Sequence, residues 1–279
     1  YRPVNQDAEL IEAFVSAIKV LAHAAGMARA HPNDEGTEGR RAAREALLGY
    51  AILAVGEARS FVLLLSDGLD KHARIHMRAI YEYEFRVRTL LNDDSLAPAF
   101  MRSFAYEARA MGRDLGTDAE KIDAEIARAL NRHPDDIESG KESAALFGGT
   151  MKKAMDDESA GTKRYAVTFR WASQISHGLI MGLREMEKSV HGADRDVFER
   201  AARAPNTETV LYVLIWPLLH LTVLLQREFG VDVEREVSRA IVDAERVNDR
   251  LRFVSHEHFV SGLADIGITA ADGGTNPSP

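Results

Sequence analysis

Apolar residues recur at intervals of three and four along most of the chain, which is the period of the α-helix. No sustained alternation of apolar and polar residues appears, so β-strands are not expected. The pattern predicts an all-α protein, a single bundle of seven to eight helices that occupies residues 1–264. Residues 265–279 have no periodicity and contain Gly, Thr and Pro, so we expect a disordered tail there.

Three helices are predicted in the first third of the chain. They end near His31-Pro32, at Asp67-Gly68 and before the polar run 92–95. The residues expected to face inward are Ile11, Phe14, Ile18, Leu21 and Ala25 in the first helix, Leu48, Ala51, Val55, Val62 and Leu65 in the second, and His76, Ile80, Tyr83, Val87 and Leu90 in the third.

The remaining helices lie on either side of a region where the pattern weakens. A fourth helix follows residue 95, and a capping box of Thr117 and Glu120 opens a short fifth. Glycines interrupt residues 134–161, which we interpret as a long connection. Three long helices are predicted after it, over 162–190, 207–229 and 231–254. The last keeps a heptad spacing that is typical of a seam against a neighbouring helix or a second subunit: Val237, Ala240, Ala244, Val247 and Leu251.

Composition narrows the possible functions. The 279 residues carry 35 Lys and Arg against 43 Asp and Glu, a formal net charge of −8. An acidic chain is not expected to coat duplex DNA or an anionic membrane. The chain has no cysteine, which excludes disulfides, Cys-ligated metals and thiol nucleophiles. Any chemistry must therefore use His, Arg and carboxylates.

One segment, Val210 to Leu225, has sixteen residues without a formal charge. It is shorter than the ~20 residues of a membrane-spanning helix, and Pro217 and His220 stand in its middle. We expect a buried central helix, kinked at Pro217, in which His220 bonds to a partner in the core. No basic segment followed by an apolar core opens the chain, so a cytoplasmic protein is expected.

The predicted helix over 162–190 carries the clearest candidate site. Projected at ~100° per residue, its polar face aligns Arg170, His177 and Arg184 at intervals of seven, with Ser173 beside them. Guanidinium groups can hold phosphate oxygens, while an imidazole moves a proton near neutral pH. The row predicts an anion or phosphate site, and a solvated polar face is the alternative.

The third predicted helix offers a second set of candidates. Arg78 and Glu82 are four residues apart and can pair along the helix surface. Glu82 stands among bulky apolar residues. If its carboxylate is buried it requires a cationic partner, and Arg170 or His177 would serve.

A metal or cofactor is not expected. His72 and His76 have the four-residue spacing of two ligands on one helical face, but the sequence offers no evident third ligand. A histidine on an apolar stripe, as His76 is, is more often a core residue with a hydrogen-bond partner. The chain has no P-loop, dinucleotide-binding glycine pattern, nucleophile elbow or zinc-protease motif.

Two segments carry a resemblance to a known family. Arg78-Ala-Ile-Tyr-Glu82, taken with Tyr165 and with Ser173-x-x-Ser176-His177-Gly178, resembles a bacterial all-helical family of unknown function. That family is similar to the HEPN superfamily, and the resemblance covers roughly residues 48–190. HEPN ribonucleases use an Arg followed by a short spacer and a His, and six residues separate Arg170 from His177.

The resemblance implies a metal-independent ribonuclease in a defence or toxin–antitoxin setting, formed where two subunits of a homo-oligomer meet. His177 would act as general acid/base and Arg170 would stabilise charge on the phosphate. The supporting residues would be Glu82, Arg78, Ser173 and Arg184. Trp171 departs from the pattern, because a polar residue commonly follows the Arg. A second hypothesis therefore stays open, a non-enzymatic helical binding or regulatory protein with a small anionic ligand.

Local charge is compatible with either hypothesis. Residues 71–88 and 163–188 each carry five basic and two acidic residues, within an otherwise acidic chain. These two segments predict a basic seam that could take single-stranded RNA or a small anion while disfavouring long duplex DNA.

Overall fold

The computed structural model describes residues 8–31, 36–98, 100–101, 121, 207–252 and 263–264. Within these ranges the chain forms α-helices and one 3₁₀ turn and no strand, so the all-α prediction is confirmed there. The elements are α1 (Ala8–Arg29), α2 (Glu38–Ser66), α3 (Asp70–Asn92), the 3₁₀ turn η1 (Asp94–Leu96), α10 (Thr207–Phe229) and α11 (Glu234–Leu251). The predicted fifth helix (apart from residue 121), most of the fourth, the 134–161 connection, the helix over 162–190 and the tail lie outside the described residues.

The described residues belong to two compact units. The first unit contains α1, residues 47–66 of α2, residues 70–84 of α3, α10 and α11. The second unit contains residues 36–46, at the start of α2, and the residues from 85 onward that complete α3 and form η1. Each unit is described separately below.

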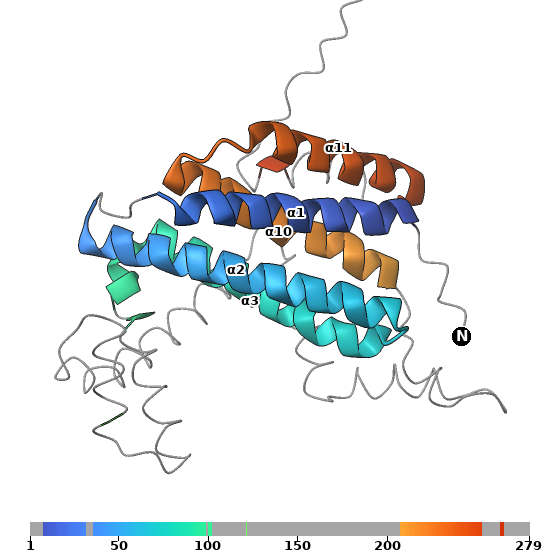
Figure 1. Cartoon of the computed structure of the whole chain (residues 1–279), viewed down its shortest axis with the longest axis horizontal. Helices are drawn as coiled ribbons and strands as arrows, with labels where there is room; N and C mark the ends of the chain where they lie inside the picture. Colours follow the sequence, from blue (N-terminus) through green and yellow to red (C-terminus); the bar gives the residue numbers. More distant parts are fainter. Residues whose placement is uncertain are drawn as a thin grey trace, which may run out of the picture. The chain divides into compact units, whose positions relative to one another are not determined.

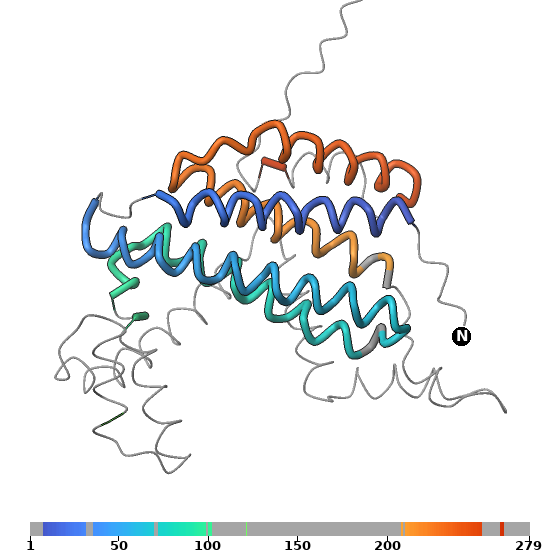
Figure 2. Tube along the Cα trace, viewed as in Figure 1, coloured from blue at the N-terminus to red at the C-terminus, as the bar shows by residue number. Residues whose placement is uncertain are grey.

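In the first unit, α1 packs against both α10 and α11, and these two helices also contact each other (Figure 1). The α2 and α3 helices run side by side and are joined by a short turn at residues 67–69 (Figure 2). Phe14 of α1 meets Phe61 of α2 edge to face, with ring centroids 5.8 Å apart. At the surface, Nε of Arg250 in α11 lies 3.2 Å from Oε2 of Glu9 in α1.

The α10 helix is the most deeply buried part of this unit, as predicted, and its bounds agree with the expected 207–229. Most of its residues are apolar and buried, which removes a large apolar area from water and makes α10 the centre of the core. The buried apolar side chains of α10 are Val210, Leu211, Tyr212, Leu214, Ile215, Trp216, Leu218, Leu219, Leu221, Leu224, Leu225 and Phe229.

Pro217 lies inside α10 and changes its backbone hydrogen bonding. Proline has no N–H, so the carbonyl of Val213, four residues earlier, lacks its usual helical donor. The hydroxyl of Tyr81 in α3 donates to that carbonyl oxygen at 2.9 Å. A side chain of α3 thus replaces the bond that the proline removes, and α10 continues through Pro217.

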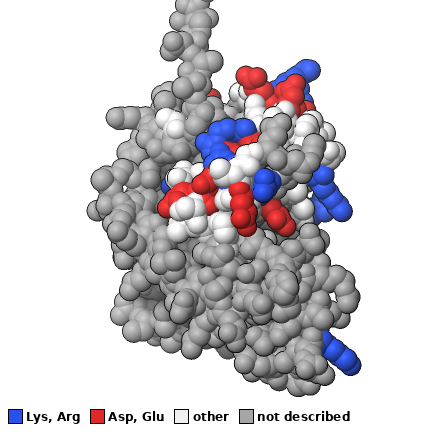
Figure 3. Space-filling model, turned by 90° about the vertical axis from the view of Figure 1, so that its left-hand side faces the viewer, with Lys and Arg blue, Asp and Glu red and all other residues white. Residues whose placement is uncertain are grey.

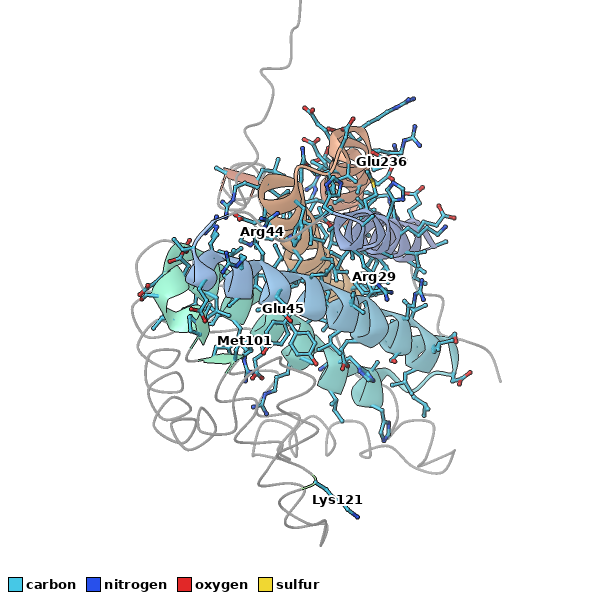
Figure 4. All side chains as sticks on the ribbon, turned by 60° about the vertical axis from the view of Figure 1, so that its left-hand side comes forward. Arg29, Arg44, Glu45, Met101, Lys121 and Glu236 are labelled. Carbon is cyan, nitrogen blue, oxygen red and sulfur yellow. The ribbon has the colours of Figure 1, made fainter. Side chains whose placement is uncertain are left out.

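The predicted seam of α11 is buried against its neighbours within the same chain. Val237, Ala240, Ala244 and Val247 are buried, while Leu251 is half-buried. This stripe belongs to the helix that packs on α1 and α10. Glu236, in the first turn of α11, is exposed and lies on the outer side (Figure 4).

The buried face of α3 is rotated from the expected stripe. Ile80, Val87 and Leu90 are buried as predicted, but His76 and Tyr83 are only half-buried. Two charged residues, Arg74 and Glu84, are buried instead. A prediction that uses the spacing of apolar residues cannot anticipate buried charged residues, because it assigns every charged residue to the surface.

In the second unit, the start of α2 is fixed by polar contacts. Thr37 caps the helix, its Oγ1 accepting from the backbone N–H of Arg40 at 3.1 Å. The Arg40 guanidinium donates to the carbonyl of Leu91 at 2.9 Å. Gly39 passes so close to Asp94 that a Cβ would lie 2.4 Å from the Asp94 carbonyl oxygen, so only glycine fits there. Arg44, labelled in Figure 4, is buried in this unit.

Candidate functional site

The predicted site residues divide between described and undescribed parts of the chain. Arg170, Ser173, His177 and Arg184 lie outside the described residues, so their predicted roles stay predictions. Arg78 and Glu82 are described, and both belong to the α3 segment of the first unit.

Arg78 and Glu82 form the predicted pair along one face of α3. The Arg78 Nε lies 3.9 Å from Glu82 Oε2, and both side chains are half-buried. Glu82 therefore has a cation within reach on its own helix, and its carboxylate is not enclosed in the core. The pair leaves a guanidinium and a carboxylate partly accessible from outside the bundle.

A second group of polar residues links α2 to α3. Nδ1 of His76 is hydrogen-bonded to Oε2 of Glu57, and both side chains are half-buried. Sequence reasoning did not identify Glu57, because a single Glu on an apolar helix carries no pattern and its partner lies nineteen residues away. The pairing depends on the rotation of α2 against α3, which only the packed structure reveals.

Tyr83 and Tyr50 extend this group. The Tyr83 hydroxyl donates to Glu57 Oε1 at 3.5 Å, and the rings of Tyr83 and Tyr50 are stacked with centroids 5.0 Å apart. Burial raises the pKa of Tyr83 to about 12, and the negative charges of Glu57 and Glu82 add to the effect. The phenol therefore stays protonated at neutral pH and remains a donor. We call Tyr50, Glu57, His76 and Tyr83 the α2–α3 cluster.

Glu57 determines which nitrogen of His76 can meet a ligand. An ionised carboxylate only accepts hydrogen bonds, so the Nδ1 that touches Oε2 must carry the proton. The other nitrogen, Nε2, has no hydrogen-bond partner among the described residues. Neutral His76 would use Nε2 as an acceptor, and protonated His76 would use it as a donor. A carboxylate bonded to Nδ1 fixes the tautomer and the orientation of the imidazole.

A third polar pair lies in the core. Nδ1 of His220 in α10 is 2.6 Å from Oε1 of Glu84 in α3, and both residues are buried. The prediction that His220 is a core histidine with a hydrogen-bond partner is confirmed. Both side chains are enclosed by protein, so this pair joins two helices and does not face a ligand.

Metal binding has no support in the described residues. They contain no group of three or more His, Asp or Glu side chains that could hold a metal ion. His72, the predicted neighbour of His76 in a two-histidine site, is exposed.

The predicted basic seam is tested in one of its two segments only. Within α3, Arg74 is 1% exposed, so its charge contributes little to the surface. On the face drawn in Figure 3, most of the described Lys and Arg side chains lie near Asp and Glu side chains. The segment 163–188 lies outside the described residues.

Three described helices are long and apolar enough to cross a membrane, judged by length and composition alone. They are α1, α2 and the Val210–Phe229 part of α10. Sequence reasoning identified only the α10 segment, because it looked for a run without any charged residue. A membrane-spanning helix can contain a few charged residues, so α1 and α2 also qualify by length and composition. The most apolar window of α10 is 78% buried among other helices, and that of α2 is 28% buried.

No family model, curated protein or solved structure matches this chain. Its function must therefore be argued from its own residues.

Proposed function

We propose that the protein is a metal-independent endoribonuclease similar to HEPN nucleases, with His177 as general acid/base and Arg170 stabilising charge on the phosphate. Ser173, Arg184, Arg78 and Glu82 would support this site. In this proposal the full chain is a bundle of seven to eight helices that acts in the cytoplasm as a homodimer.

The observation that carries the proposal is the Arg78–Glu82 pair. These residues form the Arg…Glu half of the family motif. They lie on one face of a helix in an all-α fold, with Arg78 Nε 3.9 Å from Glu82 Oε2. The pair is half-buried, while the buried face of α3 carries Met77 and Ile80. A guanidinium held at this position is accessible to a phosphate or to a second helix.

The proposed reaction needs only proton transfer and charge stabilisation. A ribose 2′-oxygen attacks the adjacent phosphorus while the bond from phosphorus to the 5′-oxygen breaks. The 2′-hydroxyl loses a proton and the departing 5′-oxygen gains one. The imidazole serves one of these two transfers, and water serves the other. A guanidinium stabilises the negative charge that gathers on the phosphoryl oxygens.

The direct test is cleavage of single-stranded RNA by the purified protein in the presence of a chelator. We expect cleavage by the native chain and its loss in His177→Ala, with the melting temperature unchanged. His72→Ala is the matched control, because His72 is exposed on α3 and has no role in the proposal. RNA that stays intact under all conditions would contradict the proposal, as would a large loss of stability in His177→Ala.

The second candidate function is a non-enzymatic helical protein that binds a small anionic ligand or has a regulatory role. The departure at Trp171 favours it, because a bulky indole stands where nuclease motifs commonly have a polar residue. In the same experiment this candidate would leave the RNA uncut.

A further inference from the structure

We infer that the outer face of α2 binds the same face of a second copy of this chain, with the two helices antiparallel and crossing at Gly56. We call this face the α2 stripe. It consists of residues of the first unit that are exposed or half-buried: Gly49, Ile52, Leu53, Gly56, Ser60 and Leu63. The inference assigns a surface to the homodimer of the proposed function, and it does not depend on ribonuclease activity.

The large apolar side chains of the α2 stripe are open to solvent. Ile52, Leu53 and Leu63 are each at least 50% exposed. The stripe positions are related by steps of three and four residues, so they lie on one side of the helix. They span residues 49–63, roughly 21 Å along the helix axis, and none of them is charged. A contiguous apolar strip, unlike scattered apolar residues, is typical of an interaction surface.

Two glycines inside α2 indicate that another helix approaches this face closely. Gly49 and Gly56 are exposed, and a Cβ built on either one meets no described atom within 4 Å. Glycine destabilises a helix interior relative to alanine, and packing within the described residues does not require it at either position. A residue without a side chain lets a neighbouring backbone come close.

The order of large and small residues along the α2 stripe identifies a second copy as its partner. In an antiparallel pair that crosses at Gly56, the two copies of Gly56 meet. A residue a given number of positions before Gly56 then meets the residue the same number of positions after it. Ile52 therefore faces Ser60 of the second copy, and Leu63 faces Gly49 of the second copy. Each of these contacts sets a large side chain against a small one, and two-fold symmetry repeats both contacts.

A parallel pair would not match in this way. It would set Ile52 on Ile52, Leu63 on Leu63 and Gly49 on Gly49, which crowds some levels of the interface and leaves voids at others. The antiparallel pair also accommodates Arg59, which is exposed at the edge of the stripe. Arg59 lies opposite Leu53 of the second copy, where its methylene groups can cover the leucine while its guanidinium reaches water.

A lipid bilayer fits the α2 stripe less well than a second helix does. Burying the stripe in hydrocarbon would bring the Arg59 guanidinium to the same depth, which is costly. The α3 helix runs beside α2 and carries the half-buried Arg78 and Glu82. Lipid chains also gain nothing from glycines, because they contact large apolar side chains as readily as small ones.

The first test is sedimentation velocity of the full chain over a range of concentrations. The stripe is one helix wide, so its interface is smaller than the roughly 800 Å² per partner of a standard complex. We therefore expect a dimer that dissociates on dilution in the micromolar range. Gly56→Leu should weaken this dimer about tenfold or more, because a side chain at the crossing point forces the helices apart.

The fold of the Gly56→Leu variant is expected to be preserved. Leucine favours a helix interior and its Cβ has open space, so the melting temperature should stay the same or rise. Gly26→Leu is the matched control. Gly26 is equally open on α1, but its exposed neighbours His23 and Arg29 are polar, so this substitution should leave the dimer unchanged.

The second test determines the register by cross-linking, since the chain contains no cysteine of its own. Under mild oxidation, Gly56→Cys should form a disulfide-linked dimer. A mixture of Ile52→Cys and Ser60→Cys should link the two chains, whereas Ile52→Cys alone should not. In the inferred pairing the two copies of residue 52 are eight positions apart, roughly 12 Å, which exceeds the ~7 Å that a disulfide permits between Cα atoms. Val242→Cys, exposed on α11, is the control that should not link.

The possible outcomes are distinct. A chain that stays monomeric at every concentration overturns the inference, as does a dimer that Gly56→Leu leaves unchanged or strengthens. Disulfide formation by Ile52→Cys alone overturns the antiparallel register. Flotation of the full chain with phosphatidylcholine vesicles, increased by Gly56→Leu, would make lipid the occupant and overturn the second copy.

Failure of this inference also differs from failure of the proposed function. RNA cleavage by a chain that stays monomeric overturns the α2 stripe as a dimer interface and leaves the nuclease in place. A dimer of the inferred register that never cleaves RNA supports the α2 stripe and overturns the nuclease.

Discussion

The first unit contains two histidine–glutamate pairs that differ in how much water reaches them. His220 and Glu84, between α10 and α3, have side chains that are 10% and 8% exposed. His76 and Glu57, between α3 and α2, have side chains that are 23% and 27% exposed. In both pairs the histidine uses Nδ1, so the chemistry is the same and the surroundings differ.

This difference in exposure predicts different costs for breaking the two pairs. In the core, removal of one member leaves a charge or a polar group that water cannot reach, and the cost is high. At the surface, water replaces the missing partner and the cost is small. Of these two described pairs, His76–Glu57 is the one that solvent reaches more.

The largest loss of stability is expected when the buried His220–Glu84 pair, here called the core pair, is broken. The more exposed His76–Glu57 pair is called the surface pair. His220→Ala leaves the buried Glu84 carboxylate without its imidazole, and we expect the free energy of unfolding to fall by about 3–5 kcal/mol. Urea unfolding measures the loss. The double variant Glu84→Leu/His220→Leu is the control, because apolar replacement of both members should recover most of the stability. A loss below about 1 kcal/mol in His220→Ala would remove the distinction between the pairs.

Breaking a neutral hydrogen bond between α3 and α10 should lower the free energy of unfolding less than breaking the His220–Glu84 pair. Tyr81→Phe removes the donor to the Val213 carbonyl, and we expect a loss of about 1–3 kcal/mol because that carbonyl sits beside a proline. Pro217→Ala restores a backbone N–H at the position that normally serves Val213. In a double-mutant cycle, Tyr81→Phe should therefore cost less when Pro217→Ala is present. Equal costs in both backgrounds would show that the hydroxyl does not replace the missing N–H.

Breaking the surface pair should have a smaller effect again. His76→Gln should lower the free energy of unfolding by at most about 1 kcal/mol, because the pair is partly solvated. The measurement is urea unfolding alongside His220→Ala. A loss as large as that of His220→Ala would show that the two pairs contribute equally to stability.

The last effect concerns stability at alkaline pH. The folded chain keeps the Tyr83 proton to about pH 12, whereas the unfolded chain releases it near pH 10.0, the ordinary pKa of a tyrosine. The unfolded state therefore binds fewer protons in this window, and the free energy of unfolding falls as pH rises from about 10 to about 12. Tyr83→Phe removes this contribution, so its stability should decline less steeply over that window. Thermal unfolding of both chains at several alkaline pH values measures how steeply stability declines. Identical slopes in the native chain and in Tyr83→Phe would contradict the raised pKa of Tyr83.

Helix positions were predictable where the apolar period was strong. The bounds of α10 agree with those predicted, and the heptad of α11 is buried from Val237 to Val247. The α3 stripe was predicted less well, because Arg74 and Glu84 are charged residues that the fold encloses. A prediction from charge alone puts such residues at the surface. Glu84 can be buried because His220 of another helix is hydrogen-bonded to its carboxylate.

The candidate site was predictable only where its residues share one helix. Arg78 and Glu82 could be paired from their four-residue spacing. The α2–α3 cluster could not, because Glu57 and Tyr50 meet His76 and Tyr83 through the rotation and register of two antiparallel helices. The row of Arg170, His177 and Arg184 remains a prediction.

The bond between Tyr81 and Val213 has a consequence for how the chain is made. The donor precedes the acceptor by 132 residues, and at roughly 5–20 residues per second a ribosome synthesises Tyr81 about 7–26 s before Val213. The proline-containing helix thus emerges after α3, which supplies the donor that it lacks. Correct formation of α10 depends on a docking surface made earlier, and slower translation between them would lengthen the time for which that surface stays uncovered.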